Sequence, residues 1–99
     1  MKASIAIQIL PNTTDDREVV RIVDEVIDYI KSTGLHYYVG PCETAIEGDD
    51  LHQLTEIMEK CVLVANKAGS DKVSAYVKLT YADEGSVLTI DEKVTKHHQ

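Results

Sequence analysis

The sequence has few basic residues. Lysine and arginine together number 10 against 17 aspartates and glutamates, which gives the 99-residue chain a formal net charge of −7 at pH 7. No cluster of lysine and arginine reverses this balance locally, so the phosphate backbone of a nucleic acid would be repelled. The composition therefore excludes nucleic acid as a partner. It suits a cationic or neutral ligand, although an acidic surface also serves solubility alone.

Long hydrophobic runs are absent as well. No apolar stretch approaches the roughly 18 residues of a membrane span. A strand pattern begins at Ala3, with no signal-peptide pattern before it. The two cysteines, Cys42 and Cys61, have no C-x-x-C spacing, and we interpret both as reduced thiols. These absences predict a cytoplasmic protein without a membrane partner.

Signatures of catalysis and of metal or cofactor binding are missing too. The four histidines, His36, His52, His97 and His98, have no zinc-site spacing, and we expect the pair at the chain end to be mobile. Cys42 has no predicted base nearby, which argues against a nucleophile. No glycine-rich nucleotide-binding loop occurs. We therefore expect no metal, no cofactor and no catalytic residue.

The sequence does contain a regular succession of strand and helix patterns. Alternating hydrophobicity predicts strands, and apolar residues at three- and four-residue spacing predict helices. The predicted strands are 3–10, 37–39, 43–47 and 73–81, and the predicted helices are 15–32, 50–67 and a short one from 89 to 94 or 96. A turn at Gly40-Pro41 joins the two middle strands. With 43 % hydrophobic residues, we expect one domain with one modest core over residues 1–99.

This order of elements predicts an α+β domain of the ferredoxin-like, βαββαβ type. Right-handed crossovers give a four-stranded antiparallel sheet of order 4-1-3-2, with two helices on one face and a short C-terminal helix appended. A different α+β packing of the same elements is the alternative. Acylphosphatases share this strand order but need an anion-binding arginine loop after the first strand. Residues 11–16 are acidic here, which excludes that function.

In this arrangement one face of the sheet has no helices over it. Alternation places both polar and apolar side chains there, among them Leu10, Tyr38 and Tyr76. Such a mixed face is too apolar for an ordinary solvent-exposed surface and too polar for the core of a monomer. Faces of this kind are usually covered by another copy of the chain, so we expect a homo-oligomer.

The same face is predicted to gather polar groups across neighbouring strands. Pairing of the first and third strands should set Gln8 near Glu43 and Ser4 near Glu47. Pairing with the fourth strand should set Lys78 near Ser4 and Ser74 near Gln8. Two carboxylates beside tyrosine rings are able to hold a small aromatic cation. The alternative is that Glu43 and Glu47 simply pair with Lys78 or with lysines of a neighbouring subunit.

Five stretches, 5–11, 22–27, 33–35, 40–48 and 88–94, resemble the small thiamine-binding protein family, formerly a domain of unknown function. The most specific is Gly-Pro-x-Glu-Thr-x-x-Glu-Gly at 40–48. The resemblance implies the ferredoxin-like fold and sheet-to-sheet dimers that pair into tetramers. It also implies non-catalytic binding of thiamine or its hydroxymethyl-pyrimidine moiety, for sequestration or delivery.

The resemblance also suggests which residues touch the ligand. Thiamine carries a permanent positive charge and an aminopyrimidine ring, which suits an acidic face that bears tyrosines. The candidate ligand-binding residues are Glu43, Thr44, Glu47, Gln8, Ser4, Tyr38 and Tyr76. Two alternatives stay open: a structural or regulatory homo-oligomer with no small-molecule ligand, and an enzyme that acts on a small substrate in the same place.

Overall fold

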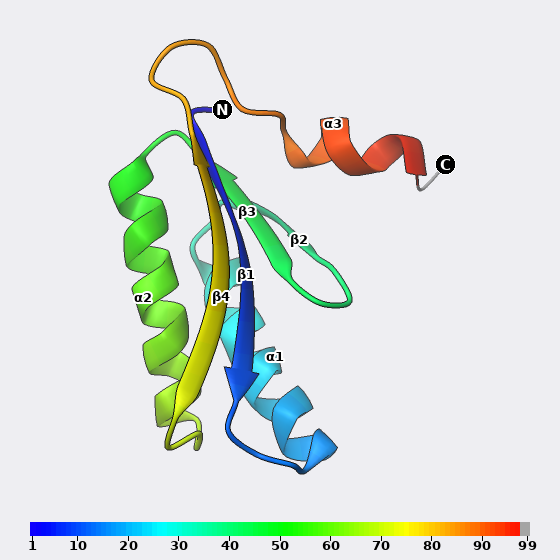
Figure 1. Cartoon of the computed structure of the whole chain (residues 1–99), viewed down its shortest axis with the longest axis vertical. Helices are drawn as coiled ribbons and strands as arrows, with labels where there is room; N and C mark the ends of the chain where they lie inside the picture. Colours follow the sequence, from blue (N-terminus) through cyan, green and yellow to red (C-terminus); the bar gives the residue numbers. More distant parts are fainter. Residues whose placement is uncertain (98–99) are drawn as a thin grey trace.

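The structure, a computed structural model, describes residues 1–97, so the prediction for His98 lies outside the described residues. The elements follow the predicted order (Figure 1). The strands are β1 (Ala3–Pro11), β2 (His36–Val39), β3 (Thr44–Gly48) and β4 (Val73–Tyr81). The helices are α1 (Asp16–Ser32), α2 (Leu51–Lys67) and α3 (Ile90–Val94), and a 3-10 turn at Thr95–His97 follows α3.

The four strands form one antiparallel sheet. β1 lies in the middle and pairs with β3 and β4, and β2 pairs with the other edge of β3, which gives the order β2-β3-β1-β4. This is the predicted order read from the opposite edge. The ferredoxin-like topology predicted from the sequence is therefore confirmed.

The core lies between the sheet and the two long helices. Successive side chains of a strand point to opposite faces, so alternate residues of β1 are buried. The buried core residues of these elements are Ala3, Ile5, Ile7 and Ile9 of β1, Ile46 of β3, Ile22, Val26 and Ile30 of α1, and Leu54, Ile57, Cys61 and Ala65 of α2. In the part of the chain that the structure describes, no helix is both long and apolar enough to cross a membrane.

The ends of α1 follow local signals in the sequence. Asp15 Oδ1 accepts a hydrogen bond from the Arg17 N–H at 2.9 Å, which caps the positive end of the helix. Beyond the helix, Gly34 has φ +77°, the left-handed conformation predicted for it. Together these residues fix where β2 begins, and so where the β2–β3 hairpin lies.

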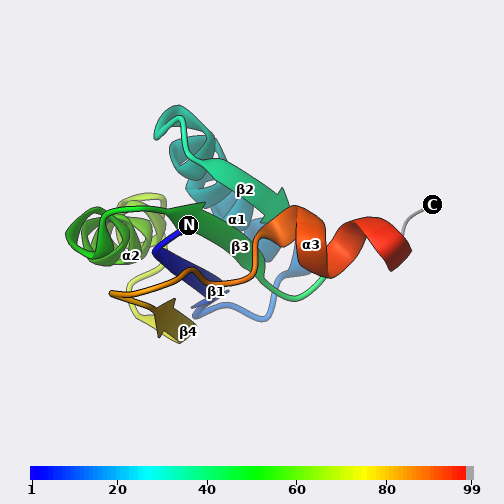
Figure 2. The same cartoon turned by 90° about the horizontal axis from the view of Figure 1, so that it is seen from above.

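The short helix α3 lies on the face of the sheet that α1 and α2 leave open. Thr89 and Glu92 form the predicted capping box at its start. Figure 2 shows α2 and α3 on opposite sides of the sheet, with α3 beside β3. The open face is therefore partly covered by the chain's own C-terminal segment.

Candidate ligand-binding site

Strand pairing sets the side chains of the open face in rows. One row runs Lys78, Ala6, Ala45 and Tyr38, because Ala6 pairs with both Lys78 and Ala45, and Ala45 pairs with Tyr38. The two middle positions of this row hold alanines. A row with small side chains at its centre and large ones at its ends leaves a depression in the sheet surface.

The neighbouring row brings three candidate residues together. Gln8 pairs with Tyr76. Ile7 pairs with Thr44, so continuing that register by one residue sets Gln8 beside Glu43, as predicted. The third row pairs Ser4 with Glu47, also as predicted. The predictions for Lys78 and Ser74 were wrong, each by two residues along the strand. Lys78 lies opposite Ala6 and not Ser4, and Ser74 lies opposite Leu10 and not Gln8.

Residues of the first two rows line a hollow of about 830 Å³ on the open face. Its polar and aromatic lining residues are Gln8, Tyr38, Glu43, Tyr76 and Lys78. The turn at 40–42 forms part of its wall, and Val94 reaches it from α3. Four of the seven candidate residues thus lie in one cavity of a size that suits a small organic ligand.

The described residues give the hollow one carboxylate, Glu43, and one ammonium group, Lys78. Lys78 Nζ lies 3.5 Å from Glu43 Oε1, and their side chains are 79 % and 38 % exposed. An ion pair this open to water contributes only about 0–1 kcal/mol of stability. The pairing considered as an alternative in the sequence is therefore present, but it is weak enough for a ligand to replace.

The second carboxylate, Glu47, lies apart from the hollow. It is only 4 % exposed, and its Oε2 accepts a hydrogen bond from the Ile90 N–H, the first residue of α3, at 2.7 Å. Ser4, its partner across the strands, is buried as well. This end of the open face is closed by α3, so Glu47 fastens the C-terminal segment to the sheet.

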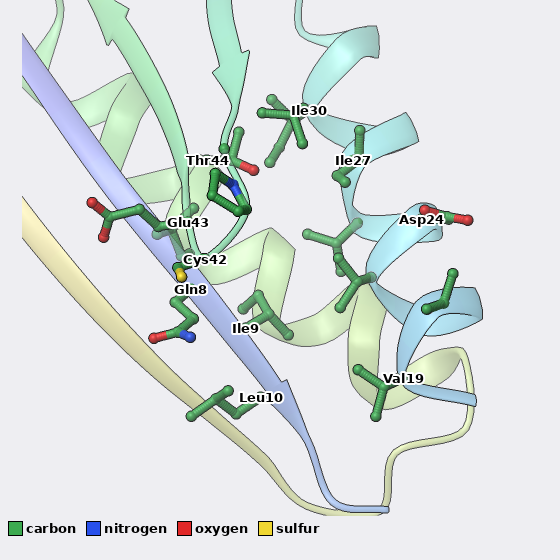
Figure 3. A pocket seen from close by; sticks show the side chains of 17 residues that line it. Gln8, Ile9, Leu10, Val19, Asp24, Ile27, Ile30, Cys42, Glu43 and Thr44 are labelled. Carbon is green, nitrogen blue, oxygen red and sulfur yellow. The ribbon is translucent and has the colours of Figure 1, made fainter. Parts of the chain in front are cut away.

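Thr44 lies on the other face of the sheet. It is 7 % exposed and lines a separate, mainly apolar cavity of about 290 Å³ between α1 and the sheet. Figure 3 shows the Thr44 side chain toward Ile30 and Ile27 of α1, whereas Glu43 and Gln8 extend the opposite way. Gln8 and Glu43 also line this cavity, but Thr44 does not line the hollow of the open face, and its contact with a ligand stays a prediction.

The two cysteines differ in environment. Cys42 is exposed in the β2–β3 turn and lines the hollow, whereas Cys61 is buried in the core. Burial raises the pKa of the Cys61 thiol to about 12, so at neutral pH it holds its proton.

Iodoacetamide at pH 8 is expected to modify Cys42 and spare Cys61 in the native protein, because alkylation needs an accessible thiolate. Mass spectrometry of peptides resolves the two sites. The protein unfolded in denaturant is the control, in which both thiols should react. Equal labelling of both cysteines in the native state would contradict this assignment.

Histidines form no metal site in the described part of the chain. His36 lies 3.5 Å from Asp91 Oδ1, and His52 lies 2.9 Å from Glu56 Oε1 on the same helix. No group of three or more histidine, cysteine, aspartate or glutamate side chains converges among residues 1–97. His36 and His52 thus make separate surface contacts.

Sequence reasoning placed Lys78 on the open face as an alternative partner of Glu43, but not among the candidate ligand-binding residues, and it missed Val94 as a residue of the hollow. The signal for Lys78 was present, since the alternation of β4 places it on the same face as Tyr76. Val94 carried no such signal. Its place depends on how the segment after β4 folds back over the sheet.

Comparison with known proteins agrees with this fold. A family profile described as thiamine-binding protein matches residues 5–98. A UPF0045 protein of Clostridium perfringens is 40 % identical over 94 residues, which cover 95 % of each chain.

Solved structures extend the comparison. A Streptococcus pneumoniae protein, 36 % identical, superposes with a TM-score of 0.80 over 96 % of this chain and 99 % of its own. A Thermotoga maritima protein with a proposed role in thiamine biosynthesis or salvage, 25 % identical, superposes with a TM-score of 0.82 over 98 % of this chain and 99 % of its own. The chain therefore belongs to the thiamine-binding protein family.

Proposed function

We propose that this protein binds thiamine or its hydroxymethyl-pyrimidine moiety in the hollow of the open sheet face. Binding is non-catalytic and serves sequestration or delivery. The observation that carries the proposal is the position of Glu43, a half-exposed carboxylate in a hollow that two tyrosines also line. Membership of the thiamine-binding family supports it.

Each group in the hollow has a role that matches the ligand's chemistry. The Glu43 carboxylate attracts positive charge or accepts from the exocyclic amine of the pyrimidine. Tyr38 and Tyr76 offer ring faces for stacking and for contact with a cation. The Gln8 amide both donates and accepts, as a pyrimidine edge requires. We place the ring over Ala6 and Ala45, where the sheet surface is lowest.

In this proposal the remaining candidate residues do not contact the ligand. Glu47 and Ser4 hold α3 in place, and α3 brings Val94 to the hollow. Thr44 supports the strand from the helix side. This arrangement assigns ligand contact to Glu43, Gln8, Tyr38 and Tyr76.

We further propose that the open face is shared between copies of the chain, as a homodimer that pairs into a homotetramer. Tyr76 is 67 % exposed and Leu10 is exposed on the same face, an unusual position for large apolar groups in a monomer. The same observation favours the second candidate function, a structural or regulatory homo-oligomer without a ligand. Light scattering on the full chain measures the mass, and a monomer would contradict both assemblies.

Thermal unfolding with added ligands separates the two candidate functions. Thiamine at 100 times its dissociation constant should add about 2.7 kcal/mol of stability. Thiamine, its phosphates and the free hydroxymethyl-pyrimidine are to be tested in parallel. If none of these ligands raises the unfolding temperature, the binding function is contradicted and the ligand-free oligomer remains.

Gly40→Ala is expected to weaken thiamine binding by distorting the β2–β3 turn. The Gly40 N–H donates to the Glu43 carbonyl oxygen at 2.9 Å, and a Cβ at Gly40 would lie 2.8 Å from that oxygen. Relieving this clash must displace Glu43. We expect an affinity loss of about ten-fold together with about 1–2 kcal/mol of stability.

Gly34→Ala is the matched control for this variant. Alanine is strained at this left-handed position, φ +77°, although no atom lies close to the new Cβ. The substitution should lower the stability of the protein by about 1 kcal/mol. Because Gly34 lies away from the hollow, thiamine affinity by calorimetry should not change. If both variants lose affinity equally, the loss reflects stability and not the turn.

A further inference from the structure

The hollow is electrically balanced, although the chain as a whole is strongly acidic. Among residues 1–97, Glu43 is the one acid that lines it and Lys78 the one base. The second acid of the motif, Glu47, is buried under α3 with an oxygen committed to the Ile90 N–H. A ligand in the hollow therefore meets one negative and one positive group, which lie 3.5 Å apart when they pair with each other.

A ligand with only a positive charge does not match this pair. To reach Glu43 it must displace Lys78, which then loses its counter-ion and faces a like charge at close range. Lys78 thus competes with such a ligand for Glu43. A ligand that also carries an anionic group avoids this cost, because each charge in the hollow gains a new partner as the old pair opens.

The two charged side chains extend from opposite sides of β1, Lys78 from β4 and Glu43 from the position directly before β3. Lys78 lies on β4, an edge strand, and Tyr38 lies on β2, the opposite edge, with Ala6 and Ala45 between them. Neighbouring strands are about 4.8 Å apart, so the floor between Lys78 and Tyr38 spans about 14 Å. A ring over the alanines beside Glu43 leaves the β4 side for an anionic tail. The long, 79 % exposed Lys78 side chain is able to follow that tail.

We infer that the preferred ligand is a phosphate monoester of the thiamine class, with its ring at Glu43 and its phosphate at Lys78. This inference rests on the proposed function. The alternative of a ligand without phosphate leaves Lys78 as a competitor. A lysine is a common phosphate partner and binds as a point charge, which suits a single terminal phosphate.

Calorimetry with thiamine and thiamine monophosphate tests the inference on the full chain. The wild-type protein should bind the monophosphate about three- to ten-fold more tightly than thiamine, and high salt should reduce this difference. Lys78→Gln should change the two affinities in opposite directions. It should weaken binding of the monophosphate and strengthen binding of thiamine, because Glu43 loses its competitor.

Two control variants are compared with Lys78→Gln. Lys78→Arg keeps the charge and should keep the preference for the phosphate ester. Lys60→Gln removes an exposed lysine from α2, on the opposite side of the sheet, and should leave both affinities as they are. A variant that merely misfolds would bind both ligands more weakly.

The possible results separate this inference from the proposed function. If thiamine binds as tightly as its monophosphate, or if Lys78→Gln shifts both affinities alike, the inference is overturned while thiamine binding stands. If neither ligand binds the wild-type protein, the proposed function fails and the inference fails with it. Opposite shifts in Lys78→Gln support the assignment of the phosphate to Lys78.

Discussion

Replacing Glu43 with glutamine is expected to weaken thiamine binding about ten- to 150-fold, with the fold unchanged. The change keeps the size of the side chain and removes its charge, so it removes the counter-ion of the ligand. A charge-assisted contact of this kind typically contributes about 1.5–3 kcal/mol, which is the basis of the expected loss. Isothermal titration calorimetry measures the affinity.

The control for Glu43→Gln is a glutamate on the helix layer. Glu59→Gln removes the same charge from an exposed position of α2, far from the hollow. It changes the net charge of the chain equally, so it accounts for any long-range attraction of a cation. If the two variants bind thiamine alike, Glu43 has no specific role in binding.

Replacing Glu47 with alanine should release α3 from the sheet and destabilise the protein by about 2 kcal/mol. The buried carboxylate accepts the Ile90 N–H at 2.7 Å, and its loss removes a charge-assisted hydrogen bond and leaves a small cavity. For a chain of this size the midpoint of thermal unfolding should fall by about 10 °C. Amide exchange of Ile90–Val94 should accelerate more than that of β1.

Glu47→Gln provides the matched comparison. The glutamine side chain retains an oxygen that is able to accept the Ile90 N–H, so the loss of stability should be smaller and α3 should stay in place. Unchanged exchange of Ile90–Val94 in the alanine variant would show that other contacts hold the helix. An equal loss in both variants would show that the charge, not the acceptor, is what matters.

The sequence was sufficient to predict which face each strand residue occupies. In β1 the alternation of isoleucines against Ser4 and Gln8 assigns the two faces directly, because side chains repeat every two residues. Gly34 and the Thr89–Glu92 capping box marked element ends through local backbone chemistry. These features depend on neighbouring residues only, which is why they were accessible without coordinates.

The register of β4 was not accessible in the same way. A slip of two residues keeps every side chain on its predicted face, so hydrophobic patterning does not distinguish Lys78 opposite Ser4 from Lys78 opposite Ala6. No tight hairpin joins β1 to β4 to fix the alignment. That shift moves the ammonium group into the hollow, where it pairs with Glu43.

The position of α3 could not be predicted from the sequence either. Its existence follows from its cap, but its contact with Glu47 depends on how the segment 82–89 crosses the end of the sheet. As a result, two glutamates that alternation placed on one face have different surroundings. Glu43 is open to a ligand, whereas Glu47 is closed beneath the helix.

A crystal structure of the full chain with thiamine would show where the ligand binds. We expect the pyrimidine ring on the open sheet face, between Tyr38 and Tyr76, with the Glu43 carboxylate within hydrogen-bond distance. A ring in the apolar cavity beside Thr44 and α1, or a ligand that leaves Glu43 paired with Lys78, would contradict this expectation.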